Sequence, residues 1–289
     1  MREENTSLKK NDPVNRGVKR TFFYFAMIII VCIILLPVFT MISTAFKPSA
    51  EIYSSSNFLP QNPTLDHYQT VSKFRGGIFF LGIKNSLVVC FMVVIIQSFV
   101  VSLAGYAIVR FSSLFTRIYS SMLLLLYILP NTLALIPLFV FFKRINVIET
   151  HNSLFLAYMM MTMPFAIWMF KAFIASLPYS LEEAAMIDGC SVMGAYFRIV
   201  LPLTTPGIVA ISVNSFLVCW SEYLMSSVFV KTEKLRTVTV MLQFFREESY
   251  SEWGALLAAA CIASIPALFI LLFGQKYIIS GIAAGAVKE

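Results

Sequence analysis

Charged residues are scarce in this sequence. Asp, Glu, Lys and Arg together make up 13% of the 289 residues, about half of their usual share in a soluble domain. Hydrophobic residues make up 58%, and the mean hydropathy is +0.80. A soluble domain of this length cannot bury so much apolar surface. The composition therefore excludes an ordinary globular enzyme, a disordered chain and a secreted disulfide scaffold, and it leaves an integral membrane protein.

The sequence also lacks the short motifs that mark common catalytic and metal sites. It contains no GxxxxGK(S/T) phosphate loop, no HExxH zinc motif and no GxSxG nucleophile motif. Its five cysteines include no CxxC pair and lie mostly in apolar runs, so we interpret them as buried hydrophobic residues. Outside the apolar runs, the sequence contains no stripe of basic residues interleaved with aromatic residues. We therefore expect no nucleic-acid partner. We therefore expect a chain that is not an enzyme and carries no metal or cofactor of its own.

Long runs with almost no charge are abundant, and each is long enough to cross a bilayer as a helix. A hydrocarbon core of about 30 Å requires about 20 apolar residues in a helix. The sequence therefore predicts an all-α integral membrane protein with six transmembrane helices. The predicted spans are Thr21–Phe46, Asn85–Val109, Ile118–Phe142, Asn152–Phe170, a span within Gly207–Val230, and Trp253–Gln275.

The distribution of basic residues predicts that both ends of the chain are cytoplasmic. Six of the 22 Lys and Arg residues fall in the first 20 positions, and such clusters stay on the cytoplasmic side. With six crossings, 12 basic residues fall inside and 10 outside, so the prediction depends mainly on the N-terminal cluster. We expect a basic cytoplasmic segment over 1–20, a transmembrane domain over 21–275 and a cytoplasmic tail over 276–289.

The connection over 177–206, between the fourth and fifth predicted spans, carries a helix-start pattern. Ser180 followed by Glu183 matches the capping box S-x-x-E. Glu182 and Glu183 fall in the first turn, where carboxylates interact favourably with the helix dipole. Gly189 suits the position that follows the helix. The pattern predicts a short helix with an acidic N-terminal end.

The predicted short helix covers about 181–188. Residues that share one of its faces are Leu181, Ala184, Ala185 and Asp188. A second helical stretch follows, so the connection forms a helical hairpin on the predicted cytoplasmic side. The hairpin is either an amphipathic linker that lies on lipid or a docking element for a protein. Its acidic end disfavours an anionic lipid surface, so we favour a protein partner.

The same connection resembles a known family. It contains Glu183-Ala184-Ala185, then Gly189, then Ile199-x-Leu201-Pro202. This order resembles the "EAA" loop in the permease subunits of ATP-binding cassette (ABC) importers. With Asp188 and Phe197, the loop is most similar to that of carbohydrate permeases of the maltose-permease type. Other stretches agree with the family in the same order along the chain, namely 106–111, Pro130, 136–138 and 275–289.

The resemblance implies a transport subunit rather than an enzyme. It implies a second homologous permease subunit, a homodimeric ABC ATPase that holds ATP and Mg²⁺, an extracellular solute-binding protein, and a mono- or oligosaccharide substrate. The short helix is then a coupling helix that seats in a cleft of the ATPase. Closure of the ATPase on ATP switches the cavity between its inward- and outward-facing states. The implied location is the bacterial cytoplasmic (inner) membrane.

The resemblance also implies roles for residues of the loop. The expected ATPase-coupling residues are Glu182, Glu183, Ala184, Ala185, Asp188 and Gly189. The expected packing or hinge positions are Phe197, Ile199, Leu201 and Pro202. Glu183 also has the simpler role of capping its own helix, so two roles stay open for it. The tail after Gln275 is implied to reach the ATPase as well.

Glu222 is the one charged residue within the six predicted spans, and intramembrane carboxylates are costly and usually functional. Trp220 and Tyr223 flank it, and aromatic rings beside a carboxylate suit a sugar. The simpler alternative is an interfacial residue that reaches water near the lipid headgroups. Further polar candidates for a substrate path are Asn214, Asn131 and Gln97.

Other functions stay open on the sequence. A proton- or ion-coupled secondary carrier needs several intramembrane charges and often repeated halves, whereas this chain offers Glu222 alone. A membrane-embedded enzyme needs convergent acid, base or metal groups, and helix capping explains the acidic residues of the loop better. Within the ABC class, a non-sugar solute such as glycerol phosphate is an alternative substrate.

Overall fold

The computed structural model describes residues 13–54, 56–111, 113–248 and 252–286, and every regular element in these ranges is a helix. The long helices are α1 (Pro13–Ala45), α4 (Ile78–Arg110), α5 (Leu114–Ile128), α7 (His151–Ser176), α10 (Leu201–Ser221) and α13 (Trp253–Ala286). The shorter ones are α2 (Ser49–Ser54), α3 (Asp66–Lys73), α6 (Leu135–Arg144), α8 (Ser180–Ile187), α9 (Val192–Ala195), α11 (Leu224–Phe229) and α12 (Val238–Glu248). Single turns are η1 (Phe74–Gly76), η2 (Asn131–Ala134), η3 (Tyr196–Val200) and η4 (Glu233–Leu235). The prediction of an all-α protein is confirmed.

The apolar runs of the sequence correspond to the long helices. In the described ranges, five helices are long and apolar enough to cross a membrane, and one bent pair makes a possible sixth. Four predicted spans coincide with continuous helices, namely α1, α4, α7 and α13. The structure differs from the prediction in the third and fifth spans, where the backbone breaks within an apolar run.

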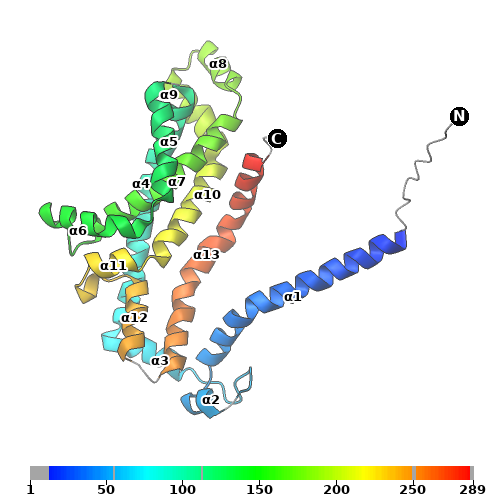
Figure 1. The fold of residues 1–289 in the computed structure, drawn as a ribbon, viewed down its shortest axis with the longest axis vertical. Helices are drawn as coiled ribbons and strands as arrows, with labels where there is room; N and C mark the ends of the chain where they lie inside the picture. Colours follow the sequence, from blue (N-terminus) through cyan, green and yellow to red (C-terminus); the bar gives the residue numbers. More distant parts are fainter. Residues whose placement is uncertain (1–12, 55, 112, 249–251, 287–289) are drawn as a thin grey trace.

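The third predicted span is two helices instead of one. The chain turns by 95° between α5 and the segment formed by η2 and α6. Pro130 has no N–H to donate, and Leu129 before it adopts an extended conformation (φ −64°, ψ 131°) because a following proline disfavours the α region. As a result, α6 projects away from the bundle (Figure 1), and its Ile136 side chain is 74% exposed. The third predicted span, Ile118–Phe142, is therefore not one continuous helix but a bent pair, with Pro130 at the bend.

The fifth predicted span also breaks, at Glu222. α10 ends at Ser221, Glu222 is extended (φ −72°, ψ 126°), and the short α11 follows. At its other end the helix starts earlier than predicted, directly after the π-helical turn η3. The helix continues from η3 without a break, since the Leu201 N–H donates to the Tyr196 carbonyl, and Pro202, which has no N–H to donate, directly follows this π-helical turn. The apolar run over 207–230 is thus divided between α10 and α11.

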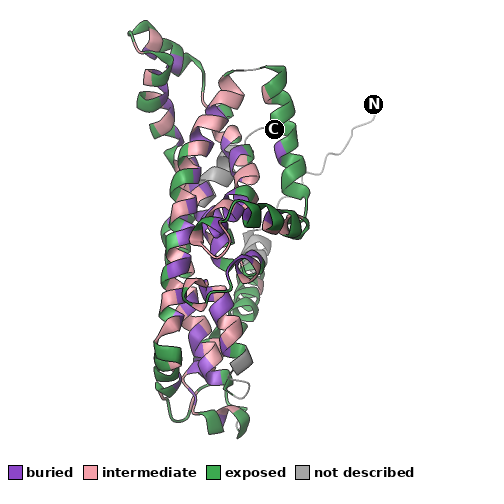
Figure 2. Ribbon diagram, turned by 90° about the vertical axis from the view of Figure 1, so that its left-hand side faces the viewer, coloured by how far each residue is buried: buried purple, intermediate pink, exposed green. Residues whose placement is uncertain are grey.

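The core of the bundle lies between α4, α7, α10 and α13. α4 packs along α7 and α10, and α10 also packs along α13. Figure 2 shows the buried segments concentrated where the long helices face one another. Gly207 allows α10 to approach α7, because a Cβ atom at this position would lie 2.6 Å from the Phe173 ring. The bundle therefore holds its helices by close, mostly apolar packing.

α1 stands apart from this core. Its lower part contacts α13, whereas its N-terminal part leaves the bundle (Figure 1). None of its most apolar stretch within Arg20–Ala45 is buried. Phe22 is 71% exposed and Ile33 66% exposed. A face of this kind needs lipid or another protein to cover it.

The two ends of the bundle carry different elements (Figure 1). α8, α9 and the C-terminal end of α13 lie toward one end, and α2, α3 and α12 lie at the other. α13 continues as a helix to Ala286, so the backbone is helical through most of the segment predicted as a tail over 276–289. Most of the predicted basic segment, 1–12, lies outside the described residues.

Candidate coupling site

The predicted short helix is present as α8, Ser180–Ile187. Its predicted capping box is absent, because the N-cap residue is Tyr179 and no side chain caps the helix. Tyr179 is helical (φ −64°, ψ −25°), so its carbonyl accepts the N–H groups of Glu182 (2.9 Å) and Glu183 (3.1 Å). The helix therefore begins one residue earlier than the capping pattern indicates, and Glu183 has no capping role.

The C-terminal end of α8 follows the prediction closely. Gly189 adopts the left-handed conformation (φ 92°), and its N–H donates to the carbonyl of Met186 (3.1 Å). The next N–H, of Cys190, donates to the carbonyl of Ala185 (2.9 Å). This pair of bonds is the Schellman motif, which satisfies the last carbonyls of a helix and favours glycine at this position. A Cβ atom on Gly189 would meet no neighbour within 4 Å.

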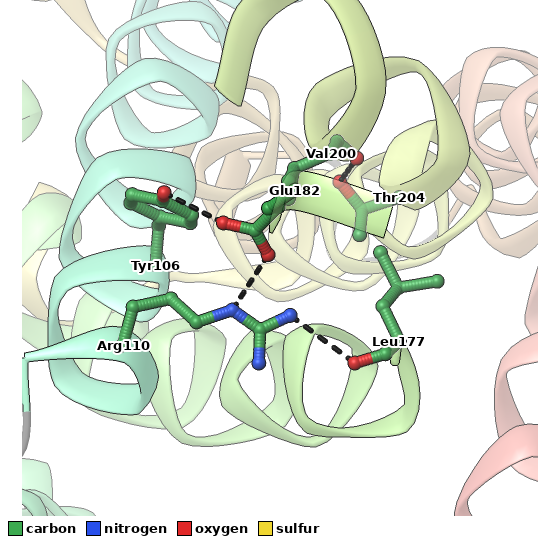
Figure 3. A network of polar contacts seen from close by, with 6 residues as sticks. All are labelled: Tyr106, Arg110, Leu177, Glu182, Val200 and Thr204. Carbon is green, nitrogen blue, oxygen red and sulfur yellow. Dashed lines mark hydrogen bonds and ion pairs between the residues drawn. The ribbon is translucent and has the colours of Figure 1, made fainter. Parts of the chain in front are cut away.

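Glu182 points into the protein and not toward solvent (Figure 3). Its carboxylate accepts from the Arg110 Nε (2.7 Å) and from the Tyr106 hydroxyl (2.7 Å). Arg110 also donates through Nη2 to the Leu177 carbonyl (3.1 Å). The Arg110 and Glu182 side chains are only 10% and 3% exposed. The charge of Glu182 is therefore neutralised within the chain, and its two oxygens are both occupied.

This network attaches α8 to the end of α4. Tyr106 and Arg110 are four residues apart, so they lie on the same face of α4. The Tyr106 ring also packs against the Tyr196 ring, with centroids 4.9 Å apart. The Arg110 guanidinium lies 5.4 Å from the centre of the Tyr179 ring. The sequence analysis did not predict either partner of Glu182. The available signal was Arg110 itself, a single basic residue at the end of a predicted span that a buried carboxylate could neutralise.

The two faces of α8 differ in what they offer. Glu182 and Ala185 are buried, three residues apart, on the face toward the bundle. The outward residues are Leu181, Glu183, Ala184, Ile187 and Asp188, of which Ile187 is 85% exposed. Of the four residues predicted to share one face, Leu181, Ala184 and Asp188 are exposed, whereas Ala185 is buried at the edge of that face toward the bundle. The exposed face is small, partly apolar and partly acidic.

The second half of the hairpin completes this surface. Ser191 caps α9, because its hydroxyl accepts the Gly194 N–H (3.1 Å). Phe197 is 49% exposed, and Val192 and Met193 are also exposed. The remaining predicted packing positions differ in burial. Ile199 and Leu201 are half-buried, and Pro202 is exposed. Leu201 packs against the core cluster that contains Tyr196 and Val200.

Glu222 has a local structural role at the break after α10. Its carboxylate oxygens accept the backbone N–H groups of Met225 (2.7 Å) and Ser226 (3.1 Å), which belong to the first turn of α11. The Tyr158 hydroxyl donates to the same carboxylate (3.1 Å). These contacts satisfy N–H groups that a helix start leaves without partners. Glu222 therefore caps α11, a role that neither sequence reading anticipated.

The other residues suggested for a substrate path do not converge on one site. Trp220 is buried and donates through Nε1 to the Ala263 carbonyl of α13 (3.1 Å). Tyr223 is 42% exposed, and Gln97 is buried with its Oε1 accepting from Thr162 (3.1 Å). Asn214 is exposed. Asn131 alone lines a cavity of about 490 Å³ beside the α5–α6 break, and the other lining residues are almost all apolar.

Comparison with known proteins assigns the fold to a class of transport proteins. A bacterial ABC transporter involved in the import of the acidic polysaccharide alginate contains a chain of the same fold, with a TM-score of 0.80 and 17% identity. The match covers 92% of this chain and 98% of that one. Residues 97–283 match the family of binding-protein-dependent transport system inner membrane components. The chain belongs to this family.

Relatives in this family align along nearly the whole chain. The diacetylchitobiose uptake system permease protein DasC of Streptomyces coelicolor is 33% identical over 254 residues, which cover 87% of this chain and 91% of DasC. The trehalose/maltose transport system permease protein MalG of Thermococcus litoralis is 29% identical over 272 residues, which cover 94% and 98%. The chain is thus a multi-pass membrane permease subunit of an ABC transport system, as the EAA pattern predicted.

Proposed function

We propose that this chain is the permease subunit of an ABC importer for a mono- or oligosaccharide. It forms the translocation path with a second homologous permease, a solute-binding protein delivers the substrate from outside, and a homodimeric ATPase binds ATP and Mg²⁺ on separate chains. Both chain ends and the α8–α9 hairpin lie on the cytoplasmic side of the bacterial inner membrane. The observation that carries this proposal is the exposed hairpin whose inner face is fixed to α4 by the buried Glu182–Arg110 pair.

The exposed face of the hairpin suits a protein partner. Ile187, Met193 and Phe197 expose apolar surface beside the carboxylates of Glu183 and Asp188. A mixture of apolar anchors and charges is typical of interface patches, and small residues such as Ala184 allow close approach. We assign the contact with the ATPase to Glu183, Ala184 and Asp188.

The buried face of the hairpin transmits the movement. Glu182 holds the first turn of α8 to Arg110 and Tyr106, and α4 in turn packs along α7 and α10. A displacement of α8 by the ATPase therefore acts on α4 through an ion pair and a hydrogen bond, and not through a flexible loop. Such rigid-body movement of packed helices is the physical basis of alternating access. In this proposal Glu182 and Ala185 are positioning residues, and Gly189 with the hinge positions Ile199, Leu201 and Pro202 maintains the hairpin.

A second permease explains surfaces that this chain leaves uncovered. α1 buries none of its most apolar stretch, and the cavity beside the α5–α6 break is lined mainly by apolar side chains. A homologous subunit that covers these surfaces would complete a two-subunit path. The sugar assignment is supported by the relatives, whose names specify diacetylchitobiose, trehalose and maltose. A coupled secondary carrier is disfavoured because Glu222, the carboxylate available in the spans, is occupied by the cap of α11.

Co-purification from native membranes tests the proposal. We expect the tagged chain, solubilised gently, to recover a second permease and an ABC ATPase, and the associated binding protein to bind a mono- or oligosaccharide. Recovery of intact chain without an ATPase would contradict the coupling role. A binding protein that selects a phosphorylated or non-sugar solute would contradict the sugar assignment. Uptake that collapses with the proton gradient while ATP is maintained would favour the secondary carrier.

A further inference from the structure

A small polar cavity lies between α4, α5 and α7 at the end of the bundle that carries α8 (Figure 1). Its volume is about 240 Å³. The lining residues are Ile108, Thr116, Arg117, Ser120, Ser121 and Lys171. It shares no lining residue with the apolar cavity beside the α5–α6 break. The residues of the proposed coupling role do not line it either, so it is a separate feature of the fold.

The cavity is positively charged and rich in hydroxyl groups. Lys171 donates through Nζ to the Ser120 hydroxyl (2.8 Å), and Ser120 is buried. Among the residues that the structure describes, no carboxylate forms an ion pair with Lys171 or Arg117. The nearby Arg110 is different, because Glu182 neutralises it. An ammonium group has three donors, so Lys171 retains capacity for an anionic ligand beside its bond to Ser120.

The position of these charges matches the headgroup level of a membrane. Arg117 lies in the first turn of α5, and Lys171 lies five residues before the end of α7, or about 7 Å along a helix. Charged residues near the ends of spans lie where lipid phosphates are found. A basic pocket between transmembrane helices at this depth is a typical site for an acidic lipid headgroup.

An exposed apolar face continues from the cavity along α5 toward its C-terminal end. Ser121, Leu125 and Ile128 are spaced by four and three residues, so they share one face of α5. Leu125 is 64% exposed and Ile128 is 74% exposed. Leu124 beside them is 37% exposed. The charges are therefore at one end of an apolar strip, which is the arrangement of a phospholipid.

We propose that this cavity binds the phosphate group of an anionic phospholipid, with an acyl chain along Leu125 and Ile128. Lys171 and Arg117 contribute the charge, and the hydroxyls of Thr116, Ser120 and Ser121 contribute hydrogen bonds. The lipid then bridges α5 and α7 beneath the α8–α9 hairpin. Free phosphate offers the same charge but cannot occupy the apolar strip, so the lipid is distinguished from it by its chains.

Native mass spectrometry of the detergent-purified importer, containing the full chain, tests this site. The probes are phosphatidylglycerol, phosphatidylcholine and inorganic phosphate. We expect phosphatidylglycerol to remain bound to the wild type, and the K171Q/R117Q variant to bind it at least about tenfold more weakly, because two headgroup contacts are lost. The matched control K143Q/R144Q neutralises an exposed basic pair in the last turn of α6 and should bind the lipid like the wild type. K171R preserves the charge and should also retain binding.

Several results would overturn the proposal. Equal retention of phosphatidylglycerol by K171Q/R117Q and the wild type would remove the site, as would equal retention of phosphatidylcholine. Complete displacement of the lipid by inorganic phosphate would indicate an anion site that does not use the apolar strip. Photocrosslinking from Leu125 to another protein chain instead of lipid would assign the strip to a subunit interface. If the K171Q/R117Q variant is unstable, the single variants K171Q and K171R decide the same question. K171Q should retain less phosphatidylglycerol than K171R, and equal retention would remove the site.

Discussion

Arg110 and Glu182, 72 positions apart in the sequence, form a buried ion pair with 2.7 Å between Nε and Oε1. The pair connects the last turn of α4 to the first turn of α8. Tyr106 donates to the second oxygen of the carboxylate, and Arg110 also donates to the Leu177 carbonyl, so the chain itself supplies hydrogen-bond partners to both charged groups. The helix α8, whose other face is exposed, is thereby fixed to the core of the bundle.

Removal of one partner of the pair should destabilise the protein more than removal of both. Glu182→Leu or Arg110→Met leaves an uncompensated buried charge, which costs about 3–5 kcal/mol. The double variant replaces the pair by apolar side chains and should lose clearly less than the sum of the single losses. Thermal unfolding of the purified protein in detergent measures this coupling in a double-mutant cycle. Additive losses would show that the two side chains act independently.

Glu183→Ala should separate partner contact from stability. Glu183 is exposed and caps nothing, so its removal should change the free energy of unfolding by no more than about 0.5 kcal/mol. If Glu183 contacts the ATPase, the same variant should reduce substrate-stimulated ATP hydrolysis in the assembled importer. Glu182→Ala is the comparison, because it should lower stability as well. A stable Glu183→Ala variant with full coupling would contradict the contact role.

Gly189→Asp should impair transport while leaving the chain in the membrane. Gly189 has φ 92°, a conformation that is strained for aspartate, and it ends α8 next to the exposed face. Gly76→Asp is a matched control, because Gly76 also has positive φ (72°), also meets no neighbour within 4 Å, and lies beside α3 at the other end of the bundle. Uptake assays with membrane levels measured in parallel should show a loss for Gly189→Asp alone. Equal losses would indicate backbone strain rather than a coupling role.

Much of this fold could be predicted from local sequence. The apolar runs indicate the long helices, and Gly189 indicates the end of α8 through its conformational preference. The break at Pro130 could not be predicted with the same rules, because hydropathy continues across it and proline is tolerated within many transmembrane helices. The end of α10 at Glu222 was missed for a related reason, since a single carboxylate does not interrupt an apolar run.

The candidate site was predictable only on its outer face. The EAA pattern identifies the hairpin and its exposed residues from sequence order alone. The burial of Glu182 depends on Arg110 and Tyr106, which are more than 70 positions away in the sequence. Helix periodicity placed Ala185 with Leu181 and Ala184, but the direction in which α8 faces the bundle is decided by these distant contacts. Which residues of α8 face the bundle is therefore determined by tertiary contacts and could not be predicted from the local sequence.

Glu222→Ala should lower stability without changing substrate affinity. The carboxylate accepts two N–H groups in the first turn of α11, and the loss of such a cap costs about 1 kcal/mol. Thermal unfolding should therefore shift, while the KM for uptake should stay at its wild-type value. Asn214→Ala is the comparison for a polar residue that caps nothing in the described structure. A raised KM for Glu222→Ala with unchanged stability would restore the substrate-path reading.

Glu149, in the connection between α6 and α7, should make stability depend on pH. Burial alone would raise the pKa of Glu149, but N–H groups of Thr232 and Lys231 stabilise its carboxylate and lower the pKa below the ordinary 4.5. A carboxyl whose pKa is lowered by folding contributes stability that is present above the unfolded pKa and is lost as the pH falls through the folded pKa. The wild type should therefore be more stable than Glu149→Gln at neutral pH.

This advantage over Glu149→Gln should shrink as the pH falls below 4.5, because protonation then removes the charge that the N–H groups stabilise. Unfolding temperatures of both proteins, measured in the same detergent across this range, give the difference directly. Other carboxyl groups titrate in both proteins alike, so they cancel in the comparison. A difference that stays constant down to acidic pH would mean that Glu149 joins the α6–α7 connection to Lys231 and Thr232 by hydrogen bonds that do not depend on its charge.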